Sequence, residues 1–474
     1  MSDNNTNTGF LIRTRGLLRR ALQDVLRAAG RDRTAPLRSD LPDEDLEVIK
    51  EIIDFSLSGK GGEASARATA AKLGNHYIDL DEVGRLRFFV LLAENYGVNV
   101  KEVSKAIDDY RALKDKDNNF DTTINQLRDS LITPRINLFR QFNSLDHGIK
   151  FLVDMRADLR ELLNKNEQLK PVDTELRSLL RGWFDAGFLE LRNVTWEAPA
   201  DLLEKLMAYE AVHEIQSWAD LKNRLESDRR CYAFFHPSMP NEPLIFVEVA
   251  LVNGMANNIQ DLLDESAPTT DPELADTAIF YSISNAQKGL SGVSFGDFLI
   301  KKVVDHLSHE LPNLKTFATL SPIPGFSKWL DIKLQSNDEV ISTQNKKALS
   351  ELSSSKIDQL SLKNLLDSPL WYQDNSKTEI AEPILIKLAA KYLIEERQKS
   401  SDNALDGVEH FHLSNGARVE RINWLADISP KGIKQSAGMM VNYLYPLDKI
   451  LDNHESYVTK SEIPASNEVK GLIK

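Results

Sequence analysis

Two residues in the second half of this sequence, Ser321 and His412, are candidates for acid–base chemistry. Ser321 follows an apolar run and precedes Pro322 and Pro324, which restrict the backbone and would hold the serine hydroxyl rigidly. A histidine such as His412 can donate or accept a proton near neutral pH. Each residue also has an ordinary interpretation, because a serine often caps a turn and a histidine often packs on a strand.

Other histidines raise the question of a metal site. On a strand, His410 and His412 would share one face, and such a pair could bind a metal ion. No third ligand with convincing spacing follows, so we expect no metal. His236, between an apolar run and Pro237, is a further candidate pocket residue, and a hydrogen-bonded turn is its plainer interpretation. The sequence has no Gly-x-Ser-x-Gly motif, so it does not support a hydrolase triad.

A glycine-rich turn at residues 285–296 could bind a diphosphate. Its glycines, Gly289, Gly292 and Gly296, would let backbone N–H groups approach a ligand closely, and Lys288 adds a positive charge. The expected helix at 298–311 would direct its N-terminal N–H groups to the same place. The spacing matches no Walker or dinucleotide motif. A tight turn between a strand and a helix is therefore an equally good interpretation.

The composition is that of a globular protein. The 474 residues carry a net charge of −13, which argues against nucleic acid or an anionic membrane as the main partner. Cys231 is the only cysteine, so no disulfide within the chain is expected and a reducing compartment fits. No apolar run is long enough to cross a membrane. Residues 10–33 carry seven arginines on an apolar helical pattern, which could be a mitochondrial presequence, but the acidic and polar residues among and before them favour an ordinary basic helix. We therefore expect a cytoplasmic protein.

The pattern of apolar residues divides the chain into a helical part and a mixed part. Apolar residues recur three and four apart throughout residues 10–185, which predicts a helical bundle. Beyond residue 185, β-branched and aromatic runs predict strands that alternate with helices. These runs are residues 231–235, 244–252, 278–284, 314–320, 410–413, 418–425 and 441–445.

The predicted fold class is therefore α+β with two domains. The first domain is expected at residues 1–185 and the second at residues 186–474. Residues 331–405 return to helix and polar loop, and we expect them to be a helical insertion within the second domain.

Several blocks of this sequence resemble malonyl-CoA decarboxylase. They occur in the expected order over most of residues 225–445, which makes the resemblance more specific than any single motif. The blocks are Arg230-Cys-Tyr232, Asn258-Ile-Gln260, Tyr281-Ser-Ile-Ser284, Gln287-Lys-Gly-Leu-Ser-Gly-Val293, Leu320-Ser-Pro-Ile-Pro-Gly-Phe326, Phe411-His-Leu-Ser-Asn-Gly-Ala417 and Arg421-Ile-Asn-Trp-Leu-Ala-Asp427.

The resemblance implies a function and a fold. The chain would decarboxylate malonyl-CoA to acetyl-CoA and carbon dioxide, within fatty acid metabolism. The first domain would mediate homo-oligomerisation, to a dimer or tetramer, and the second would resemble the GCN5-related N-acetyltransferases (GNAT). Ser321 and His412 would be the catalytic pair, with serine as proton acceptor and histidine as proton donor. The residues implied for substrate or CoA binding are Gln287, Gly289, Ser291, Gly292, Val293, Ser294, Phe295, Gly296 and Asp297.

Three further expectations complete the site. Asn423 and Tyr445 are candidates because the late strands should line the acyl end of the substrate, with core packing as the alternative. Many relatives carry glutamate where this chain has Ser294, so a role for that carboxylate cannot be transferred. The thioester itself accepts the electrons released on decarboxylation, so we expect no cofactor.

Two alternative functions stay open. The protein could be an acyl-CoA-dependent acyltransferase or a non-catalytic CoA-binding protein.

Overall fold

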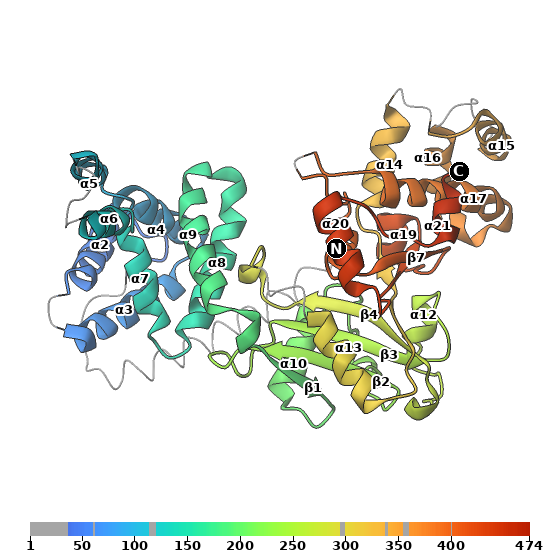
Figure 1. The fold of residues 1–474 in the computed structure, drawn as a ribbon, viewed down its shortest axis with the longest axis horizontal. Coiled ribbons are helices and arrows are strands. Elements are labelled where there is room, and N and C mark those ends of the chain that lie inside the picture. The colour runs from blue at the N-terminus through green and yellow to red at the C-terminus, as the bar shows by residue number, and fades with distance from the viewer. Residues whose placement is uncertain are drawn as a thin grey trace. The chain divides into compact units, whose positions relative to one another are not determined.

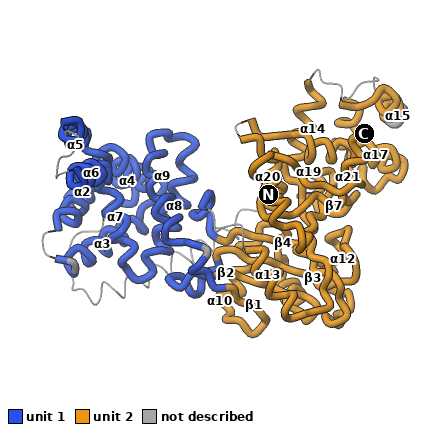
Figure 2. The backbone as a smooth tube through the Cα atoms, viewed as in Figure 1, with its two compact units in different colours: residues 1–190, 235–243, 287–294 blue, residues 191–234, 244–286, 295–474 orange. Residues whose placement is uncertain are grey.

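A computed structural model describes residues 37–59, 62–112, 120–293, 299–336, 340–353, 360–399 and 401–474. The chain divides into two compact units (Figure 2). The first comprises residues 1–190, 235–243 and 287–294, and the second comprises residues 191–234, 244–286 and 295–474. The expected basic helix at 10–33 lies outside the described residues. No helix in the described ranges is long and apolar enough to span a membrane.

Helices make up most of the described part of the first unit (Figure 1). An aromatic cluster forms part of its core, in which Tyr77 meets Phe88, Phe89 and Phe151 edge-on at centroid distances of 5.2, 5.8 and 5.7 Å. The helices are α2 (Asp43–Leu57), α3 (Gly62–Asp79), α4 (Glu82–Asn95), α5 (Val100–Ala112), α6 (Phe120–Ser130), α7 (Pro134–Asn143), α8 (Gly148–Leu162) and α9 (Lys170–Trp183), with short 3₁₀ turns η1 (Leu163–Lys165), η2 (Glu167–Leu169) and η3 (Ala186–Phe188).

Two segments from later in the sequence also belong to the first unit. One is the turn at 235–243, and the other is the glycine turn at 287–294, which contains the 3₁₀ turn η5 (Lys288–Leu290). The glycine turn packs so closely on α8 that a side chain at Gly289 would overlap the backbone carbonyl oxygen of Val153. Only glycine fits there, for a steric reason that the sequence alone does not reveal.

The second unit is built on a mixed sheet of eight strands in the order β1-β2-β3-β4-β5-β8-β6, with β7 also paired to β8. The β2–β3 and β3–β4 pairs are antiparallel, β4–β5 is parallel, and β8 runs antiparallel to β5, β6 and β7. The strands are β1 (Glu190–Val194), β2 (Arg229–Phe235), β3 (Ile245–Val252), β4 (Thr277–Asn285), β5 (Thr316–Thr319), β6 (Ser321–Pro322), β7 (Arg418–Asn423) and β8 (Met440–Leu444).

Strand β4 is irregular at its centre. Glu248 of β3 pairs with Ser282 and Val249 pairs with Phe280, so Tyr281 is an extra residue that forms a bulge. Pairing of β4 with β5 ends at Phe280 and Thr319, although β4 continues to Asn285. The two parallel strands therefore separate where the bulge begins, as bulges often terminate or redirect pairing.

Helices and 3₁₀ turns complete the second unit. Among them, α15, α16 and α17 lie within the stretch for which we expected a helical insertion. They are α10 (Ala200–Tyr209), α11 (Trp218–Asn223), α12 (Ile259–Leu262), η4 (Pro272–Leu274), α13 (Leu299–Glu310), α14 (Phe326–Gln335), α15 (Thr343–Ser353), α16 (Leu360–Leu366), η6 (Trp371–Gln373), α17 (Asn375–Glu395), α18 (Gly407–Ser414), α19 (Pro430–Ser436), α20 (Ile450–Lys460) and α21 (Asn467–Leu472).

One predicted element is wrong. Residues 410–413 were expected to form a strand, but they belong to the helix α18. The side chain of Asp406 accepts hydrogen bonds from the N–H groups of Val408 and Glu409 at 2.9 and 3.2 Å and so caps the start of this helix. Gly416, with φ of +82°, follows its end. The alternating residues between these signals were too few to decide between helix and strand.

Candidate active site

Ser321 and His412 lie in direct hydrogen-bonding contact within the second unit. The Oγ of Ser321 is 3.1 Å from Nε2 of His412, and Nδ1 of His412 is 2.7 Å from the hydroxyl of Tyr445. All three residues are buried, with exposed fractions of 6%, 3% and 2%. Because they are 91 and 33 residues apart in sequence, the fold brings together a serine, a histidine and a tyrosine that the sequence leaves separate.

The elements on either side of the pair are tied together by Asp406. Besides capping α18, its carboxylate accepts a hydrogen bond from the N–H of Gly325 at 3.1 Å and from the hydroxyl of Tyr392 at 3.3 Å. Gly325 lies four residues after Ser321. One carboxylate therefore holds both the turn that follows the serine and the helix that carries His412.

Thr319 determines the direction of the hydrogen bonds in this cluster. Its hydroxyl oxygen accepts the O–H of Ser321 at 2.9 Å and the backbone N–H of Tyr443 at 3.1 Å. With the serine proton directed at Thr319, Nε2 of His412 must donate to Ser321. A neutral imidazole has one donor and one acceptor, so Nδ1 accepts the proton of Tyr445. The result is a chain in which Tyr445 donates to His412, His412 to Ser321, and Ser321 to Thr319.

His412 is uncharged in this environment. Burial lowers the pKa of His412 to about 3, because a cation inside an apolar cluster loses its hydration. Its ring stacks on that of Tyr443, with centroids 4.6 Å apart and planes 24° apart. Burial also raises the pKa of Tyr445, so this hydroxyl is protonated in the resting protein. The cluster is therefore a set of neutral donors and acceptors at physiological pH.

Glu409 is a buried acid on the same helix as His412, one turn earlier. Its side chain is fully buried, and neither carboxyl oxygen has a hydrogen-bond partner among the described residues. Burial, reinforced by the charge of Asp406, raises the pKa of Glu409. A buried carboxyl group without a partner is far less costly when protonated, so Glu409 is neutral in the folded protein.

Asn423 contacts the cluster only indirectly, through other side chains. Its Nδ2 donates to Oδ1 of Asn442 at 2.8 Å, and Nδ2 of Asn442 donates to the carbonyl oxygen of Thr319 at 2.7 Å. Arg421 donates to the same Oδ1 atom at 3.1 Å. Asn423 is 5% exposed, and it connects to Ser321 through Asn442 and Thr319.

The glycine turn lies in the first unit. The Nε2 of Gln287 donates to the carbonyl oxygen of Pro243 at 2.9 Å, so this side chain is used inside the protein. Gly289 and Val293 are buried, and Ser291 and Gly292 are exposed. The remaining expected binding residues, Ser294, Phe295, Gly296 and Asp297, lie outside the described residues.

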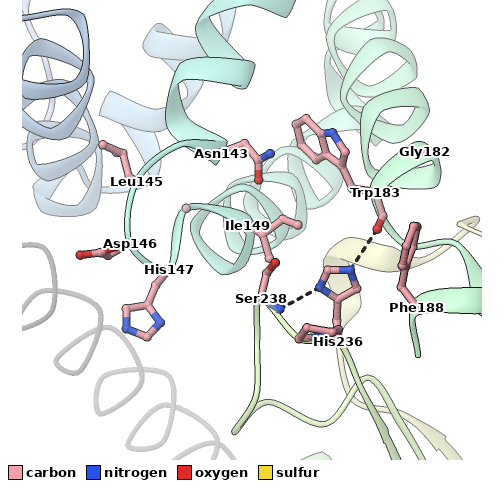
Figure 3. Close-up of a pocket in the computed structure, with 12 residues that line it drawn as sticks. Asn143, Leu145, Asp146, His147, Ile149, Gly182, Trp183, Phe188, His236 and Ser238 are labelled. Carbon is pink, nitrogen blue, oxygen red and sulfur yellow. Dashed lines mark hydrogen bonds between the residues drawn. The ribbon is translucent and has the colours of Figure 1, made fainter. Parts of the chain in front are cut away.

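His236 lines a cavity of about 610 Å³ in the first unit, between the segment at 143–149, the end of α9 and the turn at 236–238 (Figure 3). Its Nδ1 accepts the N–H of Ser238 at 3.1 Å, and its Nε2 lies 3.1 Å from the carbonyl oxygen of Trp183. Both ring nitrogens are therefore occupied. The plainer interpretation of this residue, a hydrogen-bonded turn histidine, agrees with the geometry.

No metal site is found among the described residues, where no group of three histidine, cysteine or acidic residues is arranged to hold an ion. His410 does not pair with His412, because two residues that are two apart on a helix point to different sides. Its Nδ1 is instead 2.7 Å from the hydroxyl of Tyr457.

Sequence reasoning missed Thr319, Tyr443 and Glu409. One signal was available for Thr319, because residues two apart on an extended segment face the same way. Thr319 and Ser321 have that spacing. Tyr443 and Glu409 carry no such signal.

Comparison with known proteins identifies the family. Residues 187–474 match the family described as "Malonyl-CoA decarboxylase C-terminal domain", and residues 96–184 match "Malonyl-CoA decarboxylase N-terminal domain". The chain belongs to the malonyl-CoA decarboxylase family. This confirms the family that the sequence blocks suggested.

Individual malonyl-CoA decarboxylases are similar over most of their length. The mitochondrial malonyl-CoA decarboxylase of Rattus norvegicus is 37% identical over 426 residues, which cover 86% of each chain. That of Anser anser anser is 36% identical over 96% of this chain and 94% of its own. The crystal structure of the malonyl-CoA decarboxylase from Rhodopseudomonas palustris is 40% identical, with a TM-score of 0.82, and covers 90% of this chain and 99% of its own. The expected two-domain α+β organisation, a helical N-terminal region and a C-terminal mixed-sheet domain, is confirmed.

Proposed function

We propose that this protein converts malonyl-CoA to acetyl-CoA and carbon dioxide. Membership of the malonyl-CoA decarboxylase family supports the activity, and relatives of that name are 36–40% identical over most of the chain. The observation that carries the proposed site is the hydrogen-bonded chain of Tyr445, His412 and Ser321. It places one mobile proton, on Nε2 of His412, beside a serine hydroxyl.

In the proposed reaction the thioester carbonyl of malonyl-CoA is the electron sink. The bond between the carboxylate carbon and the α-carbon breaks, carbon dioxide leaves, and the electron pair forms an enolate whose negative charge lies on the thioester oxygen. A single donor aimed at that oxygen contributes roughly 3 kcal/mol. The α-carbon must then receive one proton to give acetyl-CoA.

His412 supplies that proton from Nε2, and Ser321 assists. As Nε2 releases its proton, Nδ1 takes the proton of Tyr445, so the imidazole stays neutral and the negative charge of the enolate ends on the Tyr445 oxygen. Tyr445 then regains a proton from water. The enolate carbon is a much stronger base than a phenolate, so this transfer is favourable. Ser321 turns its O–H from Thr319 to the substrate carboxylate and so orients that carboxylate before carbon dioxide leaves.

The catalytic unit, in this proposal, has a fold like that of the GNAT enzymes. Two features support it: the parallel pairing of β4 with β5 that stops midway, and the bulge at Tyr281. At such a bulge the strand leaves the regular ladder, so its backbone N–H groups are available to a ligand. A backbone N–H near Tyr281 would be the donor to the thioester oxygen.

The remaining parts of the proposal concern binding and assembly. The glycine turn would hold the CoA diphosphate with its backbone N–H groups. The helical N-terminal region would mediate assembly into a homodimer or homotetramer. We place the protein in the cytoplasm, although the similar rat, mouse and goose proteins are named as mitochondrial.

One assay tests the activity. Purified protein is incubated with malonyl-CoA alone, and carbon dioxide and acetyl-CoA are measured, with methylmalonyl-CoA in a parallel reaction. We expect the two products in equal amounts without any added acceptor. Release of free CoA without carbon dioxide, and only when an amine acceptor is present, would point to an acyltransferase. Binding of malonyl-CoA without turnover would point to a non-catalytic CoA-binding protein.

A further inference from the structure

The glycine turn is held by a buried arginine of the first unit. Nη1 of Arg156 donates to the carbonyl oxygens of Gly289 and Ser291, at 2.6 and 2.9 Å, and its Nε contacts the carboxylate of Asp173 at 2.8 Å. Arg156 is fully buried, and its Nη2 has no hydrogen-bond partner among the described residues. The arginine thus holds the carbonyl groups of the turn with Nη1, and its Nη2 remains a donor without a partner among the described residues.

Two more arginines lie beside this one. Burial lowers the pKa of Arg156, and the positive charges of Arg160 and Arg177 lower it further, although Asp173 opposes them. Arg177 also lies against the turn itself, because a side chain built at Gly292 would have Cδ and Nη1 of Arg177 at 3.8 and 4.0 Å. Arg156 and Arg177 therefore lie at the turn, and Arg160 lies beside Arg156.

Arg160 and Arg177 have no hydrogen bond or ion pair to any residue that the structure describes. Two of the carboxylates on α8 and α9 are engaged with other cations. Asp158 pairs with Arg85 at 2.9 Å, and Glu175 pairs with Arg135 at 2.7 Å. Like-charged groups gathered without counter-ions are unfavourable, and an anionic ligand would relieve that repulsion.

We propose that Arg160 and Arg177 form, together with the turn at 287–293, an anion subsite for the phosphate groups of the CoA nucleotide. Guanidinium groups recognise phosphate through paired N–H donors. Arg156 is a positioning residue, because its donors hold the carbonyl groups of the turn. This inference rests on the proposed function, since it assumes a CoA thioester as the substrate.

The test compares substrates with and without the nucleotide. Steady-state kinetics are measured with malonyl-CoA and with S-malonyl-pantetheine, for the wild type, Arg160→Gln, Arg177→Gln and the double variant. Each arginine would give charge-assisted hydrogen bonds to phosphate, so we expect each single change to raise KM for malonyl-CoA about tenfold. The kcat for malonyl-CoA and both constants for S-malonyl-pantetheine should stay within about twofold.

A matched control and a second probe exclude a general loss of charge or fold. Arg128→Gln removes an exposed arginine on α6 and should leave every constant unchanged. Adenosine 3′-phosphate 5′-diphosphate should inhibit the wild type competitively. Its inhibition constant should be at least about tenfold higher for the double variant. Unchanged KM for malonyl-CoA, or an equal loss for both substrates, would overturn the subsite. A wild type that releases no carbon dioxide from malonyl-CoA would instead overturn the proposed function.

Discussion

The proposed catalytic cluster and the glycine turn differ in their electrostatic surroundings. Ser321, His412 and Tyr445 are buried, neutral and linked by hydrogen bonds in one direction. The glycine turn instead has exposed residues, Ser291 and Gly292, and lies near arginines that have no ion pair with any residue the structure describes. A proton transfer needs groups of fixed position and protonation state, whereas a phosphate needs positive charge. Changes in the first region should therefore lower kcat, and changes beside the second should raise KM.

The largest effect on turnover is expected at the catalytic pair. His412→Ala and Ser321→Ala should each lower kcat by about 10²–10⁴-fold, the range for loss of a positioned acid or base, while CoA binding is kept. Turnover is measured as carbon dioxide release and binding by calorimetry with CoA. His410→Ala, on the same helix, is the control and should stay close to wild type. Near-normal turnover in either variant of the pair would remove the proposed assignment.

A smaller effect is expected at Thr319. Thr319→Val keeps the shape but removes the acceptor of the Ser321 proton, so the direction of the hydrogen-bond chain is no longer fixed. One hydrogen bond contributes about 1 kcal/mol, and a buried donor left unpaired costs more. We therefore expect kcat to fall about tenfold with KM unchanged. Thr319→Ser should restore most of it. If valine and serine variants behaved alike, the hydroxyl would have no part in positioning.

A change in the glycine turn should raise KM and leave kcat nearly unchanged, unlike the changes at Ser321, His412 and Thr319. In Gly289→Ala the new methyl group overlaps the carbonyl oxygen of Val153, so the turn must move away from α8. We expect KM for malonyl-CoA to rise several-fold with kcat kept within about twofold, and a loss of about 1–3 kcal/mol in the free energy of unfolding. Gly182→Ala on α9 is the control, because open space surrounds that position. A fall in kcat alone would break the comparison between the two regions.

The smallest effect on turnover is expected at Glu409, where stability should change instead. Because the pKa of Glu409 is raised in the folded protein, the unfolded chain releases this proton first as pH rises, and the free energy of unfolding falls. The slope is about 1.4 kcal/mol per pH unit between the unfolded and folded pKa values. Glu409→Gln removes this slope. In thermal melts from pH 5 to 8, the melting temperature of the variant should rise relative to that of the wild type as pH increases. If the two melting temperatures changed with pH in parallel, Glu409 would not be neutral in the folded protein.

Much of the fold could be predicted because its signals are local. The apolar runs gave β4 and α13 to within one residue at each end, and β2, β3, β7 and β8 with small differences at their ends. The error at α18 arose because a segment of eight residues contains too few repeats to separate the two periods. Family membership also agrees with the blocks around residues 281–293, 320–326 and 411–427.

The site could be predicted only in part, because its connections are not local. Ser321 and His412 were identified as a pair, and the structure places them 3.1 Å apart. The hydrogen bond to Tyr445 and the direction imposed by Thr319 depend on which strand neighbours which. The contact between Arg156 of α8 and the turn at 287–293 depends on tertiary packing, because the helix lies more than 100 residues earlier in the sequence. No periodicity in the sequence encodes such contacts.

The position of β8 has a consequence for how the enzyme is made. This strand lies more than 100 residues after β5 and β6, yet it pairs with them and with β7, and it is followed directly by Tyr445. A ribosome releases Ser321 well over 100 residues before Tyr445, so the proposed catalytic cluster cannot exist on the nascent chain until Tyr445 has been made. Such long-range pairing is slow to form. Chains that stop before residue 440 should therefore be inactive, however well their helical N-terminal region folds.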